Sequence, residues 1–198
     1  HDAVRQTFLE FAEEEDGEPL AHMVENRALI GALREAMEEA EIPLATSGIE
    51  SYSADESFAH FDAAGRKHRT RLLAACDGAQ SKLRSLARIQ TIMHDYDQAG
   101  IVATIGHARE HNGKAVQHFL PNGSFAFLPL TGKRSSIVWT ESAAEAKRIV
   151  ALPPQEFLAE LELRFGLRLG ELELLSPARS YPLRLSIARS FIGERLAL

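Results

Sequence analysis

An acidic turn followed by a short basic stretch is the feature of this sequence best suited to hold a ligand. The apolar run Leu72–Cys76 leads into Asp77 and Gly78, and a short predicted helix with Arg84 follows. We expect the Asp77 carboxylate and the tight backbone at Gly78 to face a polar ligand. An alternative needs no ligand, because an aspartate between a strand and a helix is often only the helix cap.

A second candidate for ligand binding is Arg27, in the first turn of a helix predicted from Asn26 to about Glu41. The free N–H groups at a helix N-terminus attract anions, and a guanidinium beside them adds two parallel donors. This combination favours a phosphate-like ligand. A solvated surface arginine is the alternative interpretation of the segment.

Other patterns with known chemistry receive little support. His107, His111 and His118 invite a metal-site interpretation, but the chain there is extended, so their spacing does not bring two rings to one face and we expect no metal. We expect the single cysteine, Cys76, to be an inert buried thiol in a reducing compartment. The sequence contains no nucleophile elbow and no phosphate-binding loop, which argues against hydrolases and P-loop enzymes.

The composition of the 198 residues excludes several classes of protein. The formal net charge is -6, with acidic and basic residues mixed along the chain, so a nucleic-acid partner is not expected. No apolar run approaches the ~18 residues that a membrane-spanning helix needs. We expect a cytoplasmic protein with at most peripheral contact with the inner membrane.

The pattern of apolar residues predicts an α+β fold with two neighbouring units. Residues 1 to about 88 have the character of an α/β layer. The helix that contains Arg27 should bury one face, a hairpin should turn at Ala63–Arg66, and the run Thr70–Cys76 should be a strand covered on both faces. The inward face of that helix is predicted to comprise Leu29, Leu33, Ala36, Met37 and Ala40.

Residues from about 89 to 190 are predicted to form an antiparallel sheet with helices packed on one side. Short extended runs are separated by turns at Asn112-Gly113, Asn122-Gly123 and Thr131-Gly132, which is typical of a meander. Two helices should follow, the second opened by Pro153-Pro154 and ended by Gly166.

Four segments of the chain, in this order, resemble the ubiquinone-biosynthesis hydroxylases. That family belongs to the FAD-dependent aromatic hydroxylases, also called class A flavoprotein monooxygenases. The segments are residues 25–33, the Asp77-Gly78 turn with Ser81 and Arg84, the block comprising residues 96–103, 119–130 and 135–139, and residues 179–183.

The resemblance implies a fold like that of p-hydroxybenzoate hydroxylase, with FAD as cofactor and NAD(P)H as reductant. It implies that a flavin hydroperoxide hydroxylates the ring of a polyprenylated phenol or quinol, and that proteins of a ubiquinone-biosynthesis complex are partners. In family terms, residues 1–88 are part of the FAD/NAD(P)-binding portion, 89–190 the substrate-binding sheet, and 191–198 the return to the FAD-binding portion.

The resemblance also assigns roles to particular side chains. Arg27, Asp77 and Gly78 would bind the cofactor. The wall of the substrate pocket would comprise Phe125, Phe127, Leu128 and Trp139. Alternating aromatic residues on a strand are usually core residues, so packing is the alternative role for the wall. No catalytic side chain is assigned, because the cofactor supplies the chemistry.

Family members carry a Gly-x-Gly-x-x-Gly fingerprint that this sequence lacks, since no two of its 13 glycines are two positions apart. The sequences of family members continue beyond the position that corresponds to Leu198. We therefore expect this chain to be an internal fragment that is inactive alone. Two alternatives remain. One is another flavoprotein of the same fold, such as a different aromatic monooxygenase or a prenyl reductase. The other is a non-catalytic module that binds a hydrophobic ligand or a partner protein.

Overall fold

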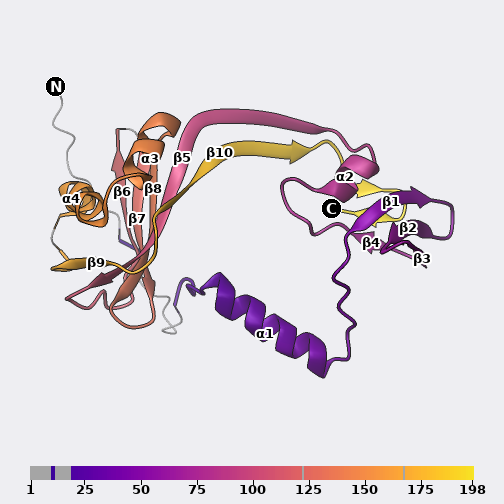
Figure 1. Cartoon of the computed structure of the whole chain (residues 1–198), viewed down its shortest axis with the longest axis horizontal. Helices are drawn as coiled ribbons and strands as arrows, with labels where there is room; N and C mark the ends of the chain where they lie inside the picture. The colour runs from indigo at the N-terminus through magenta and orange to yellow at the C-terminus, as the bar shows by residue number, and fades with distance from the viewer. Residues whose placement is uncertain (1–9, 12–18, 122, 167) are drawn as a thin grey trace.

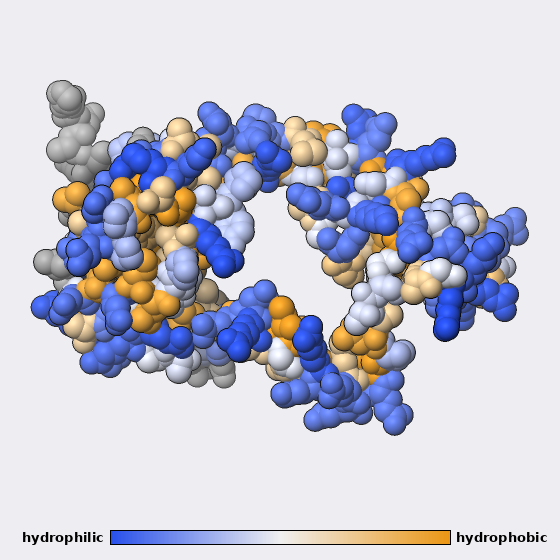
Figure 2. Space-filling model, viewed as in Figure 1, coloured by the Kyte–Doolittle hydropathy of each residue, from blue (hydrophilic) through white to orange (hydrophobic). Residues whose placement is uncertain are grey.

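The computed structural model of the chain describes residues 10–11, 19–121, 123–166 and 168–198, and it consists of two bodies joined by a long ribbon. One body is a broad sheet with two helices on one face, and the other is a group of short strands around a small helix (Figure 1). Helix α1 (Asn26–Glu39) runs between the bodies, and Figure 2 shows an open gap between α1 and the ribbon. Among the described residues, no helix is long and apolar enough to cross a membrane.

The larger body is an antiparallel sheet with the strand order β10-β5-β8-β7-β6, in which β9 also pairs with β5. The pairing of β6, β7 and β8 as consecutive hairpins confirms the predicted meander. The turn predicted at Asn122-Gly123 cannot be followed, because Asn122 is outside the described residues. The strands are β5 (Thr91–His107), β6 (Val116–Leu120), β7 (Gly123–Leu130), β8 (Arg134–Ser142), β9 (Leu172–Leu174) and β10 (Arg179–Ala188).

Two helices follow β8 in the sequence, α3 (Ala143–Val150) and α4 (Pro154–Phe165). The Ser142 hydroxyl accepts a hydrogen bond from the backbone N–H of Glu145 at 3.3 Å and so caps α3. Helix α4 begins at a proline and ends at Gly166, whose φ of 75° suits glycine. These bounds confirm the predicted helical pair.

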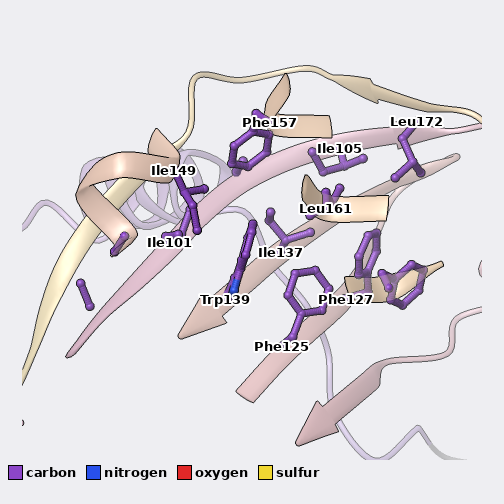
Figure 3. Close-up of a cluster of buried hydrophobic side chains, with 14 residues drawn as sticks. Ile101, Ile105, Phe125, Phe127, Ile137, Trp139, Ile149, Phe157, Leu161 and Leu172 are labelled. Carbon is purple, nitrogen blue, oxygen red and sulfur yellow. The ribbon is translucent and has the colours of Figure 1, made fainter. Parts of the chain in front are cut away.

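Side chains on one face of the sheet form the main core beneath α3 and α4. Successive side chains of a strand alternate between its faces, so residues directly opposite on neighbouring strands share a face. Ile101, Trp139 and Phe125 are opposite one another across β5, β8 and β7, and all three are fully buried (Figure 3). Phe157 and Leu161 of α4 complete this core from the helical side.

One charged side chain enters the edge of the main core. The Glu141 side chain is buried, and its Oε1 accepts a hydrogen bond from the Trp139 Nε1–H at 3.1 Å. Arg164 lies over the Trp139 ring at 4.5 Å, and its Nε is 3.6 Å from Glu141 Oε1. Among the described residues, Glu141 Oε2 has no hydrogen-bond partner. The positive charge of Arg164 therefore offsets part of the free-energy cost of burying the Glu141 carboxylate.

The smaller body combines strands that precede β5 with strands that follow β10, together with α2 (Lys82–Leu86). Strands β1, β2 and β3 form an antiparallel meander, and the positive φ angles of Ala64 and Gly65 at the β2–β3 turn confirm the predicted hairpin. Strand β12 pairs with β11 and lies parallel to β4. The strands of the smaller body are β1 (Ile49–Ala54), β2 (Ala59–Ala63), β3 (Arg66–Thr70), β4 (Leu73–Ala74), β11 (Ile192–Gly193) and β12 (Leu196–Ala197).

Two predictions for this part of the chain are wrong. Thr70–Cys76 is not one buried strand: Thr70 ends β3, β4 has two residues with β12 as their neighbour among the described strands, and Leu72 is 61% exposed. Helix α1 buries none of its residues, because no described element packs against its apolar side.

The ribbon that joins the two bodies is the continuation of β5 and β10 beyond the sheet (Figure 1). The register shifts between Pro182 and Arg184, where Asp97 of β5 has a φ of 53°. The Asp97 backbone N–H donates to Asp95 Oδ1 at 3.1 Å and stabilises this bulge. A bulge bends and twists the strand, which gives the ribbon a different course from the sheet.

Candidate functional site

The face of the large sheet opposite α3 and α4 is the first candidate for a ligand-binding surface. Val102, Val138 and Ala126 are opposite one another across β5, β8 and β7, on the side away from the core. Small apolar side chains mixed with hydroxyl groups can cover a flat ring and orient its few polar atoms. We call this surface the open face; it comprises Gly100, Val102, Thr104, Gln117, Ala126, Leu128, Ser136, Val138, Thr140, Arg179 and Tyr181.

The structure divides the expected substrate wall between the two faces of the sheet. Phe125, Phe127 and Trp139 lie on the covered face, are at most 2% exposed and pack against Phe165 or Phe157 of α4. Leu128 lies on the open face, opposite Ser136. Because the three aromatic rings fill the core, a ligand on the sheet surface would meet Leu128 but not those rings.

The Asp77 carboxylate supplements the cap of α2, whose N-cap residue is Ser81 with its hydroxyl accepting the Arg84 backbone N–H at 2.9 Å. Asp77 Oδ2 accepts the backbone N–H groups of Lys82 at 2.8 Å and Leu83 at 3.3 Å, at the start of α2. The hydrogen bond from the Ser81 side chain, followed by these backbone bonds, lowers the pKa of Asp77. Gly78 has a φ of 81°, which glycine adopts without strain. Capping accounts for Asp77 in this structure, and cofactor contact remains a prediction.

A groove of about 400 Å³ lies beside the Asp77-Gly78 turn. Most of its lining is small, and Arg84 contributes a charge, although its Nη2 donates to the Ala79 carbonyl at 2.9 Å. Small residues with a guanidinium suit a phosphate-bearing ligand. The lining includes Cys76, which is exposed, so the prediction of a buried thiol is wrong; the strand expected to bury it does not form.

Arg27 is exposed in the first turn of α1 and is not brought together with Asp77. The ion pair between Glu25 and Arg134, at 3.3 Å, fastens the start of α1 to the large sheet. Asp77 precedes α2 in the other body, at the far end of the ribbon (Figure 1). A single ligand would have to extend between the bodies to touch both residues.

The histidines make contacts with other protein groups. His107 is buried, with Nδ1 2.7 Å from the Arg109 carbonyl and Nε2 3.1 Å from Ser135 Oγ. His111 Nε2 is 2.9 Å from the Leu130 carbonyl. In the described part of the chain, no group of three or more metal-binding side chains comes together.

Sequence reasoning missed the hydroxyl-bearing residues of the open face. Thr140 lies opposite Gly100, and Gly100 lies opposite Tyr181, so a threonine and a tyrosine flank a position without a side chain. The aromatic residues alternate with these hydroxyl-bearing residues along the strands, so the same pattern places the hydroxyl-bearing residues on the opposite face of the sheet. Strand alternation does not show which of the two faces the helices cover.

Sequence comparison relates the chain to proteins of ubiquinone biosynthesis. It is 40% identical to ubiquinone hydroxylase UbiL of Rhodospirillum rubrum in an alignment 205 residues long, which covers 96% of this chain and 45% of that protein. It is 29% identical to the mitochondrial ubiquinone biosynthesis monooxygenase COQ6 of Danio rerio, over 90% of this chain and 40% of that protein. The chain thus spans less than half the length of these relatives. No protein-family model matches it.

Solved structures share the fold at low sequence identity. The flavin-dependent halogenase CmlS has a TM-score of 0.70 and 9% identity over 88% of this chain and 34% of CmlS. The flavin-dependent monooxygenase PieE, solved with FAD and substrate, has a TM-score of 0.64 and 14% identity over 88% of this chain and 33% of PieE. The α+β fold of a flavin-dependent monooxygenase and the resemblance to ubiquinone-biosynthesis hydroxylases are confirmed.

Proposed function

We propose that this chain, a relative of the ubiquinone-biosynthesis hydroxylases, is the substrate-covering and partly FAD-binding portion of a monooxygenase. The enzyme would hydroxylate the aromatic ring of a polyprenylated phenol or quinol. The observation that carries the proposal is the 40% identity to a ubiquinone hydroxylase along 96% of the chain. The sheet, with one face covered by helices and the other open, supports it.

In this proposal the open face holds the aromatic ring. Val102, Ala126 and Val138 provide a flat apolar surface, and Leu128 extends it. Apolar side chains around a reacting ring exclude water, and a few hydroxyl groups can fix the orientation of the ring. Bound FAD would supply the oxygen-transfer chemistry, whereas these residues position and shield the substrate.

The proposed cofactor contacts are Arg27, Asp77 and Gly78. The groove beside the Asp77-Gly78 turn is lined mostly by small residues, together with Arg84, Phe191 and Leu198, which is compatible with a nucleotide. Arg27 is exposed in the first turn of α1, where a phosphate oxygen could accept hydrogen bonds from its guanidinium. NAD(P)H as the reductant and proteins of a ubiquinone-biosynthesis complex as partners are further parts of the proposal, which follow from the family resemblance of the sequence.

The test is to purify the complete gene product and to measure three properties. We expect the absorption spectrum of bound FAD, consumption of NADH or NADPH that a polyprenylated phenol accelerates, and a product heavier by one oxygen atom. Arg27→Ala and Asp77→Ala should each lower the flavin content, while Arg71→Ala, which changes another arginine of the smaller body, should not. A protein that binds no flavin, or that oxidises NAD(P)H without a hydroxylated product, would contradict the proposal.

A further inference from the structure

The ribbon between the two bodies has one apolar side, which is continuous with the open face. Along β10, Tyr181, Leu183, Leu185 and Ile187 alternate with Pro182, Arg184, Ser186 and Ala188. Successive residues of a strand point to opposite sides, so the first four share one side. Tyr181 lies directly opposite Gly100, and a Cβ atom added to Gly100 would lie 3.7 Å from the Leu183 side chain. That side is therefore the continuation of the open face.

Strand β5 contributes matching residues to the same side of the ribbon. Ile92 lies opposite Ile187, and His94 lies opposite Leu185. The Tyr96 ring makes an edge contact with the His94 ring at 5.0 Å between centroids. We call this set the ribbon stripe; it comprises Tyr181, Leu183, Leu185, Ile187, Ile92, His94 and Tyr96.

The two sides of the ribbon differ in chemistry. The ribbon stripe is largely apolar, yet Ile92 is 52%, Ile187 43% and Leu185 39% exposed. On the other side, Arg184 Nε donates to Asp95 Oδ2 at 2.9 Å. Ser186 and Ala188, also on that side, line the groove beside the Asp77-Gly78 turn. This second side, which also carries the exposed Met93 opposite Ser186, thus faces the proposed nucleotide groove, and the ribbon stripe is left for a different ligand.

We infer that the ribbon stripe holds the isoprenoid chain of the substrate while the open face holds its aromatic ring; this inference rests on the proposed function. The seven residues from Tyr181 to Ile187 rise ~20 Å at ~3.3 Å per residue, enough for several isoprene units in extended form. A branched hydrocarbon chain gains binding free energy in proportion to the apolar area that it covers. The stripe starts at the open face, where the chain would leave the ring.

The test compares two substrates in the complete gene product loaded with FAD. One is a phenol with a long isoprenoid chain, and the other is the same phenol with a single isoprene unit. We expect Leu185→Ser and Ile187→Ser each to raise KM for the long-chain substrate by roughly tenfold, because apolar contact area is lost. KM for the short-chain substrate and kcat for both should stay unchanged. Leu163→Ser, which changes an 83% exposed leucine on α4, away from the ribbon, should alter neither KM.

The outcomes separate this inference from the function on which it rests. If the wild-type protein hydroxylates neither phenol, the proposed function fails. If it hydroxylates both and the two variants change both KM values equally, the ribbon stripe does not hold the chain. Loss of FAD from both variants would also overturn the inference, because the stripe would then pack against protein or cofactor.

A second measurement does not depend on the folding of variants. A substrate analogue with a photoreactive group at the end of its isoprenoid chain should label wild-type peptides within residues 91–98 or 181–188. Competition with the unlabelled long-chain phenol should suppress the labelling. Specific labelling confined to other peptides would overturn the inference.

Discussion

The large sheet and the smaller body are held together by cores of very different extent. In the sheet, side chains from β5, β7 and β8 interlock with those from α3 and α4 to form one continuous buried cluster. In the smaller body, the cluster around α2 has only three buried members among the described residues, Ala75, Leu83 and Leu196. Hydrophobic stabilisation grows with buried apolar area, so the sheet should resist local opening more strongly than the smaller body.

This difference suits a division of labour between the two bodies. A surface that positions a ring must be rigid, and the open face is the reverse side of a well-packed core. The Asp77-Gly78 turn and α1 carry the proposed cofactor contacts, and neither is braced by extensive packing among the described residues. A bound cofactor would stabilise them by mass action.

The largest effect should come from removing the central ring of the sheet core. Trp139→Ala should destabilise the protein by ~3–5 kcal/mol, because it leaves a cavity and also removes the hydrogen bond to Glu141. Urea denaturation followed by circular dichroism measures this loss, with Trp139→Phe as the milder control. A loss below ~1 kcal/mol would show that Trp139 is not a core residue, and it would reopen the prediction of substrate contact.

The same kind of truncation in the smaller body should have a local effect. Leu83→Ala should lower the free energy of local opening of the smaller body by ~2–3 kcal/mol, because Leu83 belongs to a separate core. Amide hydrogen exchange in residues 72–88 and 192–198 should therefore become faster. Amide protection in β5, β7 and β8 should stay unchanged. Equal loss of protection in both bodies would mean that they unfold as one unit.

Charge compensation at the edge of the sheet core can be tested by a double change. Arg164→Met should destabilise the protein by ~2 kcal/mol, because it removes the cation beside the buried Glu141 carboxylate and leaves the hydrogen bond from Trp139. Adding Glu141→Gln should restore much of the loss. Additive losses in the double variant, measured by denaturation, would show that the two side chains do not interact.

The cap of α2 should contribute a smaller amount. Asp77→Ala should cost ~1 kcal/mol, whereas Asp77→Asn retains an acceptor and should cost less. Because the pKa of Asp77 is lowered in the folded state, its ionisation stabilises the protein above the ordinary value of 3.8, and this stability is lost as the pH falls through the folded pKa. In a pH series of denaturation curves, Asp77→Asn should flatten the acid limb, and an unchanged limb would contradict this assignment.

The smallest expected effect is the pH dependence that His118 gives to the sheet. Burial, with a contribution from Arg168, lowers the pKa of His118 below 6.5, so the folded state favours the neutral ring. The unfolded chain binds the proton first as the pH falls below 6.5, and stability should decrease there by a few tenths of a kcal/mol. His118→Phe should remove this decrease; an identical pH profile in both proteins would contradict the assignment.

The elements of the large sheet were largely predictable because their signals are local. The alternation along residues 123–142 and the turn residues between the runs predict hairpins, and Pro154 and Gly166 mark the ends of α4. The smaller body was less predictable. Residues 70–76 are apolar enough for a buried strand, but a strand is buried only where other elements cover it, and among the described strands β4 pairs with β12 alone.

The sequence predicts which residues of the candidate site share a face of the sheet, but not which face is exposed to a ligand. The sequence alone determines that Phe125, Phe127 and Trp139 can share one face of the sheet, because strand periodicity and hairpin register are local properties. Packing of α3 and α4 decides which face is covered, and it places those rings in the core while Leu128 faces outward. The alternation of β10 is likewise written in the sequence, whereas its continuity with the open face follows from the pairing of Tyr181 with Gly100. That pairing joins residues 81 positions apart, and only tertiary structure establishes a contact over such a distance.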